Sequence, residues 1–272
     1  MEDKSFTIEQ IEYCRVKSEQ GDPDSQYNLG VIYRDGLGVQ QDYKESIKWF
    51  MKSSDLGHGY SKYTLGVMYQ NGEGVPQDYK ESIKWYRLAA EQEIELAEYN
   101  LGIMYRDGLG VPQDYKETIK WFKKSAEKGL IQSQYNLGII YANGLGVPQD
   151  YKESVEWWKK SSEQGHSGAQ YNLGVMYRDG IGITQDYEES VKWLKKSAEQ
   201  GQPDSQYTLG LMYYKGTGVS QDYVMAHIYW SIAVVYGDEP SMKGRDIVEE
   251  NMTQSQLEES QKLWKEWMER HQ

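Results

Sequence analysis

The chain has 272 residues, of which 38% are hydrophobic and 26% are charged, and its formal net charge at neutral pH is −12. Such an acidic protein gains little affinity for phosphate backbones or anionic lipid, which argues against nucleic acid and membrane surfaces as partners. The single cysteine, Cys14, excludes an intramolecular disulfide framework and a zinc site of paired cysteines. The most apolar stretch, residues 228–236, has about half of the ~18 residues that a membrane span needs.

The chain opens on an acidic, polar segment that has neither the basic nor the apolar region of an export signal. We therefore expect a cytoplasmic protein, or a periplasmic or secreted one if a signal peptide preceded Met1. The next segment predicts a helix over residues 7–20, because Thr7 and Gln10 form a capping box and Gly21 follows the last turn. We assign residues 1–24 to an N-terminal capping helix.

From residue 25 onward the chain repeats itself with a period of 36 residues, because Gly30 returns as Gly66 and again at each later step. The shared motif is Tyr-x-Leu-Gly, at residues 27–30, 63–66, 99–102, 135–138, 171–174 and 207–210. A fixed period of this size is typical of stacked supersecondary units, none of which buries its apolar face alone. The sequence therefore predicts six repeats over residues 25–240.

The first half of each repeat predicts a helix. In the first repeat, Ser25, Leu29 and Ile32 share one apolar stripe at helical spacing. Gly30 lies beside that stripe, where we expect another helix to approach too closely for a Cβ atom. A Gly-x-Gly segment follows, at residues 36–38 in the first repeat. Its first glycine is expected to end the helix in the left-handed conformation, and its second to allow a tight turn.

The second half of each repeat predicts a helix that begins after an aspartate N-cap. Glutamate stands at N3 in the first five repeats, as Glu45 does after Asp42, which makes a variant of the capping box; the sixth repeat has Met225 there. One tryptophan per repeat is predicted to lie in the core, facing the Gly30-type position. These tryptophans are Trp49, Trp85, Trp121, Trp157 and Trp193.

Two further segments depart from the repeat pattern. Residues 253–256 form a second capping box before a helix with Leu257, Ser260 and Trp264 on one face, and we assign residues 241–272 to C-terminal capping helices. Glu93 replaces a turn glycine, and a non-glycine residue in the left-handed conformation costs ~1 kcal/mol or more. We therefore expect the turn after the second repeat to differ from the others.

The repeat resembles the Sel-one-like repeat (SLR), a relative of the tetratricopeptide repeat. The motifs L-G-x-x-Y, G-x-G-V, D-Y and W-x-x-K-(S/A) carry the resemblance at fixed offsets, in six copies. The tail R-D-I-V-E-E-N-M-T-Q-S-Q-L resembles the capping segment after bacterial arrays of this family. The resemblance implies an all-α fold, a right-handed α-solenoid of six helix-turn-helix repeats with helical caps at both ends, whose first helices line a concave face.

The resemblance also implies a non-catalytic scaffold or adaptor that binds a peptide, loop or helix of a protein partner. Bacterial members of the family can accompany secreted effectors, so an immunity protein that neutralises a toxin is one form of this hypothesis; the net charge of −12 would complement a basic toxin. The alternative is a hydrolase or β-lactam-like small-molecule binder, as in the cysteine-rich branch, whose cysteine pairs this chain lacks. An RNA-reading solenoid conflicts with the acidic charge.

The partner-binding face follows from helix geometry. Tyr27, Val31 and Arg34 share a stripe that the family geometry places on the concave side. An Arg-Asp pair recurs there in every second repeat, which indicates either guanidinium forks presented at regular intervals or the duplication of a 72-residue pair of repeats. Tyrosine and arginine are enriched at interface hot spots. We predict as partner-binding residues Tyr27, Asn28, Arg34, Tyr99, Asn100, Arg106, Tyr171, Asn172, Arg178, Tyr207 and Tyr214.

No catalytic or metal-binding pattern accompanies these residues, and we expect no enzyme activity, no metal and no cofactor. The repeated aspartates are interpreted as helix caps, since their spacing of one per repeat separates them along the array. The Gly-x-Gly segments follow helices and lack the Lys and Ser or Thr of a phosphate loop. The four histidines show neither H-E-x-x-H nor triad spacing.

Overall fold

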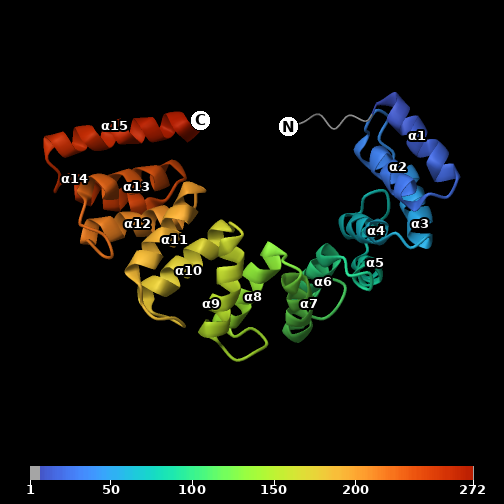
Figure 1. The fold of residues 1–272 in the computed structure, drawn as a ribbon, viewed down its shortest axis with the longest axis horizontal. Coiled ribbons are helices and arrows are strands. Elements are labelled where there is room, and N and C mark those ends of the chain that lie inside the picture. Colours follow the sequence, from blue (N-terminus) through green and yellow to red (C-terminus); the bar gives the residue numbers. More distant parts are fainter. Residues whose placement is uncertain (1–6, 272) are drawn as a thin grey trace. The chain divides into compact units, whose positions relative to one another are not determined.

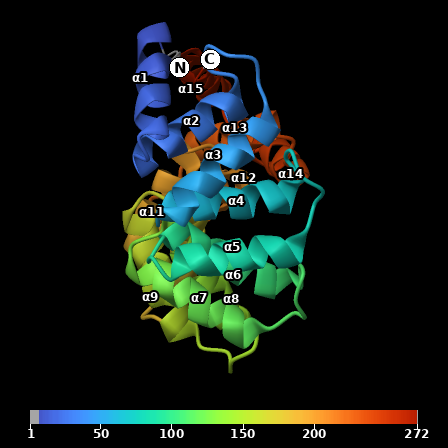
Figure 2. The ribbon, with the colours of Figure 1, turned by 90° about the vertical axis from the view of Figure 1, so that its right-hand side faces the viewer.

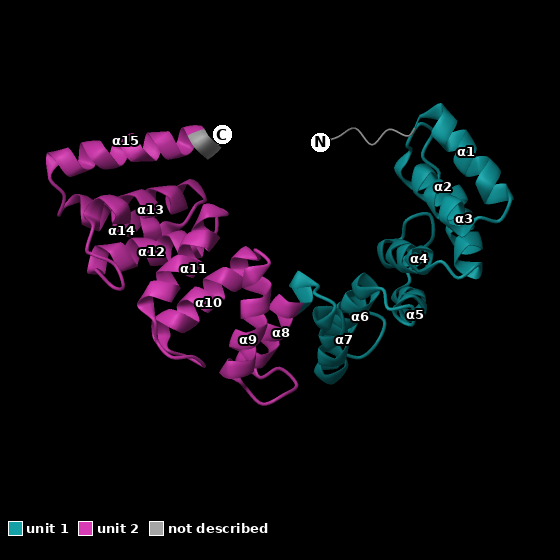
Figure 3. Cartoon of the chain, in the orientation of Figure 1, with its two compact units in different colours: residues 1–133 teal, residues 134–272 magenta. Residues whose placement is uncertain are grey.

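The structure is a computed structural model that describes residues 7–271, with the backbone alone for residues 270 and 271. These residues form fifteen helices and no strand, so the predicted all-α fold class is confirmed. The chain divides into two compact units, residues 1–133 and residues 134–272 (Figure 3). Each unit is a series of helical hairpins.

The helices of the first unit are α1 (Ile8–Glu19), α2 (Pro23–Asp35), α3 (Tyr43–Asp55), α4 (Gly59–Asn71), α5 (Tyr79–Ala90), α6 (Glu95–Asp107) and α7 (Tyr115–Glu127). The division falls inside α8 (Ile131–Asn143). The second unit continues with α9 (Tyr151–Glu163), α10 (Ser167–Asp179), α11 (Tyr187–Glu199), α12 (Pro203–Lys215), α13 (Tyr223–Val235), α14 (Glu239–Glu249) and α15 (Gln254–His271).

Within each unit, helices that follow one another in the chain pack side by side (Figure 1; Figure 2). In the first unit, α2 pairs with α3, α4 with α5 and α6 with α7, while α1 covers α2. In the second unit, α10 pairs with α11 and α12 with α13, and α14 and α15 both pack on α13. Stacking of this kind buries the apolar stripe of each hairpin against the next.

The predicted aspartate caps and glycine stops of the helices are present. The Asp42 carboxylate accepts hydrogen bonds from the backbone N–H groups of Lys44 and Glu45, at 2.9 and 3.0 Å. Asp78, Asp114 and Asp150 cap their helices in the same way, while Asp186 and Asp222 each accept one such bond, from the N3 residue. Gly36 ends α2 at φ +68°, in the left-handed conformation that glycine adopts without steric cost. The capping boxes predicted at Thr7 and Thr253 are present, but the variant box predicted at the repeat aspartates is wrong, because the Asp42 N–H group donates to the Tyr33 carbonyl and Glu45 pairs with Lys48 instead.

The contact beneath each Gly30-type residue differs from the prediction. A Cβ atom on Gly30 would lie 2.6 Å from Phe50 Cε1, so the residue after the tryptophan fills this gap. Successive residues of a helix point about 100° apart, so Trp49 turns away and stays half-buried, with Lys52 Nζ 3.9 Å from its ring centroid. The placement of the tryptophans opposite glycine is therefore wrong. The buried partners of the glycines are Phe50, Tyr86, Phe122, Trp158, Leu194 and Trp230.

The turn after the second repeat keeps the left-handed conformation without glycine. Glu93 takes φ +61°, and it is the one non-glycine residue with positive φ in the described chain. Helix α5 has 12 residues where α3 and α7 have 13. The prediction that this turn differs is therefore wrong for its backbone, which follows the glycine pattern, although the helix before it ends one residue earlier. The Lys128 ammonium donates to the Glu93 carbonyl at 2.9 Å.

The C-terminal helices close the second unit. Asp238 caps α14 through a bond from the Ser241 N–H group, as Asp22 caps α2 through Ser25. Helix α15 lays Trp264 and neighbouring apolar side chains on a buried cluster of α13, which consists of Val224, Ile228 and Ile232. None of the helices in residues 7–271 combines the length and the hydropathy that a membrane span requires.

Candidate partner-binding site

The predicted tyrosines of the first unit are half-buried between repeats. The Tyr27 ring lies 5.6 Å from the ring of Phe50 and 4.7 Å from that of His58. The Tyr99 ring stacks on Phe122 at 5.5 Å. These tyrosines therefore contribute to the packing between helices and expose the remaining part of the ring on the predicted stripe.

The predicted arginines each form a two-point ion pair with the next residue. Arg34 Nε and Nη2 donate to the two carboxylate oxygens of Asp35 at 2.7 and 2.9 Å, and Arg106 and Arg178 repeat this geometry with their own aspartates. The hydrogen bond to Asp35 raises the pKa of Arg34. Each guanidinium fork is thus occupied by a carboxylate of the chain, and the stripe presents paired charges rather than open cations.

The predicted asparagines lie beside the tyrosines and are half-buried. Burial raises the pKa of Tyr63 and Tyr86, both from the preceding repeat, and the nearby Asn100 side chain acts in the opposite direction. The Tyr86 hydroxyl donates to Gln70 Oε1 at 2.6 Å. Burial raises the pKa of Tyr63, so this hydroxyl stays protonated at neutral pH. Asn100 therefore lies close to tyrosines of the preceding repeat.

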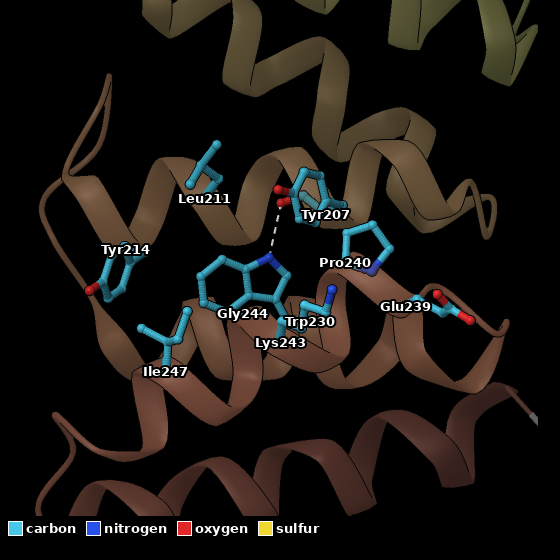
Figure 4. A pocket seen from close by; sticks show the side chains of 9 residues that line it. All are labelled: Tyr207, Leu211, Tyr214, Trp230, Glu239, Pro240, Lys243, Gly244 and Ile247. Atoms are coloured by element: carbon cyan, nitrogen blue, oxygen red, sulfur yellow. Dashed lines mark hydrogen bonds between the residues drawn. The ribbon is translucent and has the colours of Figure 1, made fainter.

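In the second unit the same stripe opens into a groove between α12 and α14, with a cavity volume of about 330 Å³ (Figure 4). Tyr207, Leu211 and Tyr214 line it from α12, and Lys243 and Ile247 line it from α14. We call this the α12–α14 groove. The structure brings two predicted residues, Tyr207 and Tyr214, together here.

The depth of the α12–α14 groove depends on a glycine. A Cβ atom on Gly244 would lie 2.7 Å from Trp230 Cε2, so α14 approaches the indole closely. Trp230 is 2% exposed, and its indole N–H donates to the Tyr207 carbonyl at 3.2 Å. The exposed side chains of Glu239 and Lys243 stand at the rim. An apolar floor with a few polar groups at its edge is typical of binding sites.

The α14 side of this groove was missed in the sequence, although a signal was present. Gly237 and Asp238 continue the 36-residue register of Gly21 and Asp22. That register places Lys243 and Ile247 at the positions of Tyr27 and Val31 in a further repeat. Because residues 241–272 were assigned to a cap, this face was not predicted to bind a partner.

The other candidate groups have structural roles. Cys14 is buried, and burial raises the pKa of its thiol, which disfavours the reactive thiolate. His58 and His166 act as N-caps of α4 and α10. Among the side chains of residues 7–269, no three of His, Cys, Asp and Glu gather closely enough to hold a metal ion.

Helical hairpins of constant length, stacked in sequence and closed by capping helices, define an α-solenoid repeat protein. More narrowly, the chain belongs to the Sel1 repeat family. The family model described as "Sel1 repeat" matches residues 23–58, 60–93, 96–130, 131–166, 167–202 and 203–234.

Solved structures of the same fold agree with this assignment. A protective antigen of uropathogenic Escherichia coli with an SLR fold is 37% identical, with a TM-score of 0.83; the match covers 85% of this chain and 50% of that one, so this chain spans half its length. A Sel1 repeat protein from Oxalobacter formigenes is 32% identical, with a TM-score of 0.69 and coverage of 83% and 99%. A weaker likeness, which does not enter this assignment, is to an immunity protein from Pseudomonas aeruginosa that is 18% identical, with a TM-score of 0.43 and coverage of 80% and 83%. No curated protein matches the chain.

Proposed function

We propose that this Sel1 repeat protein is a non-catalytic interaction scaffold that binds a segment of a protein partner through the stripe of its first helices. The observation that carries the proposal is the α12–α14 groove, where that stripe becomes concave and its apolar floor meets a charged rim. Solenoids use extended surfaces of repeated side chains for recognition, and the groove supplies a central anchor point on such a surface.

The groove favours a partner with an apolar or aromatic anchor side chain. Leu211, Ile247 and the faces of Tyr207 and Tyr214 offer apolar contact, and aromatic anchors in desolvated pockets dominate the binding energy of most interfaces. The arginines of the stripe are paired with aspartates and contribute mainly to orientation. The net charge of −12 favours a basic partner, because long-range attraction raises the association rate.

Neutralisation of a basic toxin is a narrower form of this proposal. Its support is the net charge of the chain. A toxin would meet the same groove and the same acidic surface as any other basic partner. The groove experiment below tests the shared part of both forms.

The test uses two substitutions on one helix. Ile247 is 51% exposed and lines the groove, whereas Met242 is 46% exposed on α14 and lies outside the groove lining. Ile247→Lys places a charge on the groove wall, and Met242→Lys adds the same charge at a similar exposure elsewhere. A phage-displayed library of random peptides is selected against the wild-type chain and against each variant.

We expect the wild type to enrich peptides that share an apolar or aromatic anchor. Ile247→Lys is expected to lose them, while Met242→Lys retains them. Equal enrichment by all three proteins would show that the groove is not the binding site, and enrichment of peptides without any shared anchor would contradict the anchor model.

A further inference from the structure

The α12–α14 groove has a cation at its rim that no carboxylate of the described chain neutralises. Lys243 lines the groove with an exposed side chain, and it forms no ion pair with any residue between 7 and 269. The cations of the stripe differ in this respect, because Arg34, Arg106 and Arg178 are each paired with the aspartate that follows. The Lys243 ammonium is therefore available to a charge of the partner.

Helix α12 supplies no acid to this lysine. In the sixth repeat, Tyr214 and Lys215 take the two positions of the Arg-Asp pair, so the last turn of α12 has no carboxylate there. The acid in its first turn is Asp204. Burial and then the Asp204 carboxylate raise the pKa of Tyr171, which places this acid toward the preceding repeat.

The two acids of α14 on this side also leave Lys243 unpaired. Glu239 is the first residue of α14, where the N–H groups of the helix N-terminus favour a carboxylate. Figure 4 shows the Glu239 carboxylate directed away from the groove, whereas the Lys243 side chain points toward Trp230 and Pro240. Glu250 follows Lys243 by about two helical turns, or roughly 10 Å, and does not line the groove. The charge that faces the groove is therefore positive.

An apolar group that enters the groove would remove water from the Lys243 ammonium. Trp230, which is 2% exposed, and Leu211 give the groove an apolar lining. A cation that loses hydration beside such a lining is stabilised by an acceptor of opposite charge, and the pair is stronger there than in open water. The groove therefore favours an apolar group that is accompanied by a carboxylate.

We propose that the segment that docks in the α12–α14 groove carries a carboxylate beside its apolar or aromatic anchor, and that this carboxylate pairs with the Lys243 ammonium. The inference rests on the proposed function, because it names the chemistry of the segment for that same groove. An acidic side chain and a C-terminal carboxylate share this chemistry. A basic partner can carry such a segment, since the total charge sets the long-range attraction and one group makes the contact.

The probes are two phage-displayed libraries of random peptides, one with the random segment inside the displayed chain and one with it at a free C-terminus. Each is selected against the full wild-type chain and against three variants. Lys243→Met keeps an unbranched side chain without the charge, and Lys243→Glu reverses the charge. Lys215→Glu is the matched control, because Lys215 is exposed and does not line the groove.

We expect the wild type and Lys215→Glu to enrich peptides with a carboxylate beside the shared anchor. Lys243→Met should keep the anchor and lose the preference for the acid, and Lys243→Glu should select lysine or arginine in its place. Enrichment from the first library assigns the carboxylate to a side chain, and enrichment from the second alone assigns it to the chain end. For one selected peptide, replacing the acid by its amide should weaken binding about tenfold in the wild type and little in Lys243→Met.

The outcomes separate this inference from the proposed function. Anchored peptides that show no preference for a carboxylate would overturn the pairing with Lys243 and leave the groove as a binding site. A preference for the acid that persists in Lys243→Glu would overturn it as well. Peptides without any shared anchor would overturn the proposed function and this inference together. Circular dichroism verifies that each variant is folded.

Discussion

Adjacent residues of one helix differ sharply in what they contribute to stability. Phe122 is fully buried against the backbone of Gly102, while Trp121 is half-buried and keeps its indole N–H on Glu117 at 3.1 Å. The Lys124 ammonium lies 4.7 Å from the Trp121 ring centroid. The larger side chain therefore covers the edge of the core, and the smaller one fills it.

We predict that Phe122→Ala destabilises the chain by about 3–5 kcal/mol, because it leaves a cavity beneath Gly102 that the helices cannot close. Trp121→Ala is expected to cost about 1–2 kcal/mol, since much of its ring already meets solvent and lysine. Urea unfolding followed by circular dichroism measures both. If Trp121→Ala lowered the free energy of unfolding by as much as Phe122→Ala or more, the tryptophan would be the main core residue, contrary to this prediction.

Helix α10 begins on a histidine whose role depends on its charge. His166 Nδ1 accepts a hydrogen bond from the Ala169 N–H group at 3.2 Å, and its ring stacks on Tyr135 at 4.2 Å. A protonated imidazole has no acceptor atom, so this cap requires the neutral ring. Burial lowers the pKa of His166 below its ordinary value, in the same direction.

The lowered pKa of His166 determines whether the stability of the fold rises or falls with pH. As pH falls through about 6.5, the unfolded chain binds a proton at His166 before the folded chain does, so the folded state loses stability toward acid. We predict that the melting temperature falls between about pH 7.5 and about pH 5.5, and falls less in His166→Asn. Asparagine is a good N-cap that does not titrate, which keeps the hydrogen bond and removes the proton.

The quantity to compare is the change in melting temperature between the two pH values. The melting temperature itself is unsuitable, because loss of the Tyr135 contact lowers it in His166→Asn at both pH values. Gln202, which stands at the N-cap of α12 and makes no side-chain cap bond, gives the matched control Gln202→Asn. Its pH dependence should equal that of the wild type. An unchanged acid response in His166→Asn would show that the cap does not sense protonation.

Most of this element-level organisation could be predicted from the sequence because its signals are local. Asp42, Gly36 and Thr7 act within one turn of their own position, and all three are found in their predicted roles. The choice between Phe122 and Trp121 beneath Gly102 could not be made in this way. It depends on the angle at which two helices cross, which no short motif specifies.

The candidate site was predictable only where it followed the repeat. Tyr207 and Tyr214 follow the stripe of the earlier repeats, whereas the opposing wall, with Ile247, belongs to a helix whose sequence departs from the motif. The pairing of Arg34 with Asp35 is a matter of side-chain rotamer, and sequence adjacency alone left it open.

Because the chain has a net charge of −12, its excess carboxylates repel one another at long range. This repulsion opposes the short-range attraction within the lysine–glutamate pairs. The attractive side includes exposed contacts such as Lys48–Glu45 at 2.7 Å and Lys192–Glu189 at 2.7 Å, each of which adds little to stability in water. Raising monovalent salt from about 0.01 M to about 0.15 M shortens the Debye length from about 30 Å to about 8 Å. Charges in contact are screened little by this change, while the repulsion between distant carboxylates is largely removed.

We therefore predict that the melting temperature at neutral pH rises over this range of salt. The control is the same titration near the sequence pI of about 4.9, where positive and negative charges balance and the rise should disappear. A fall in melting temperature at neutral pH would mean that the contact pairs outweigh the repulsion. In that case the acidic excess would destabilise the fold very little, and its use in attracting a basic partner would carry no cost in stability.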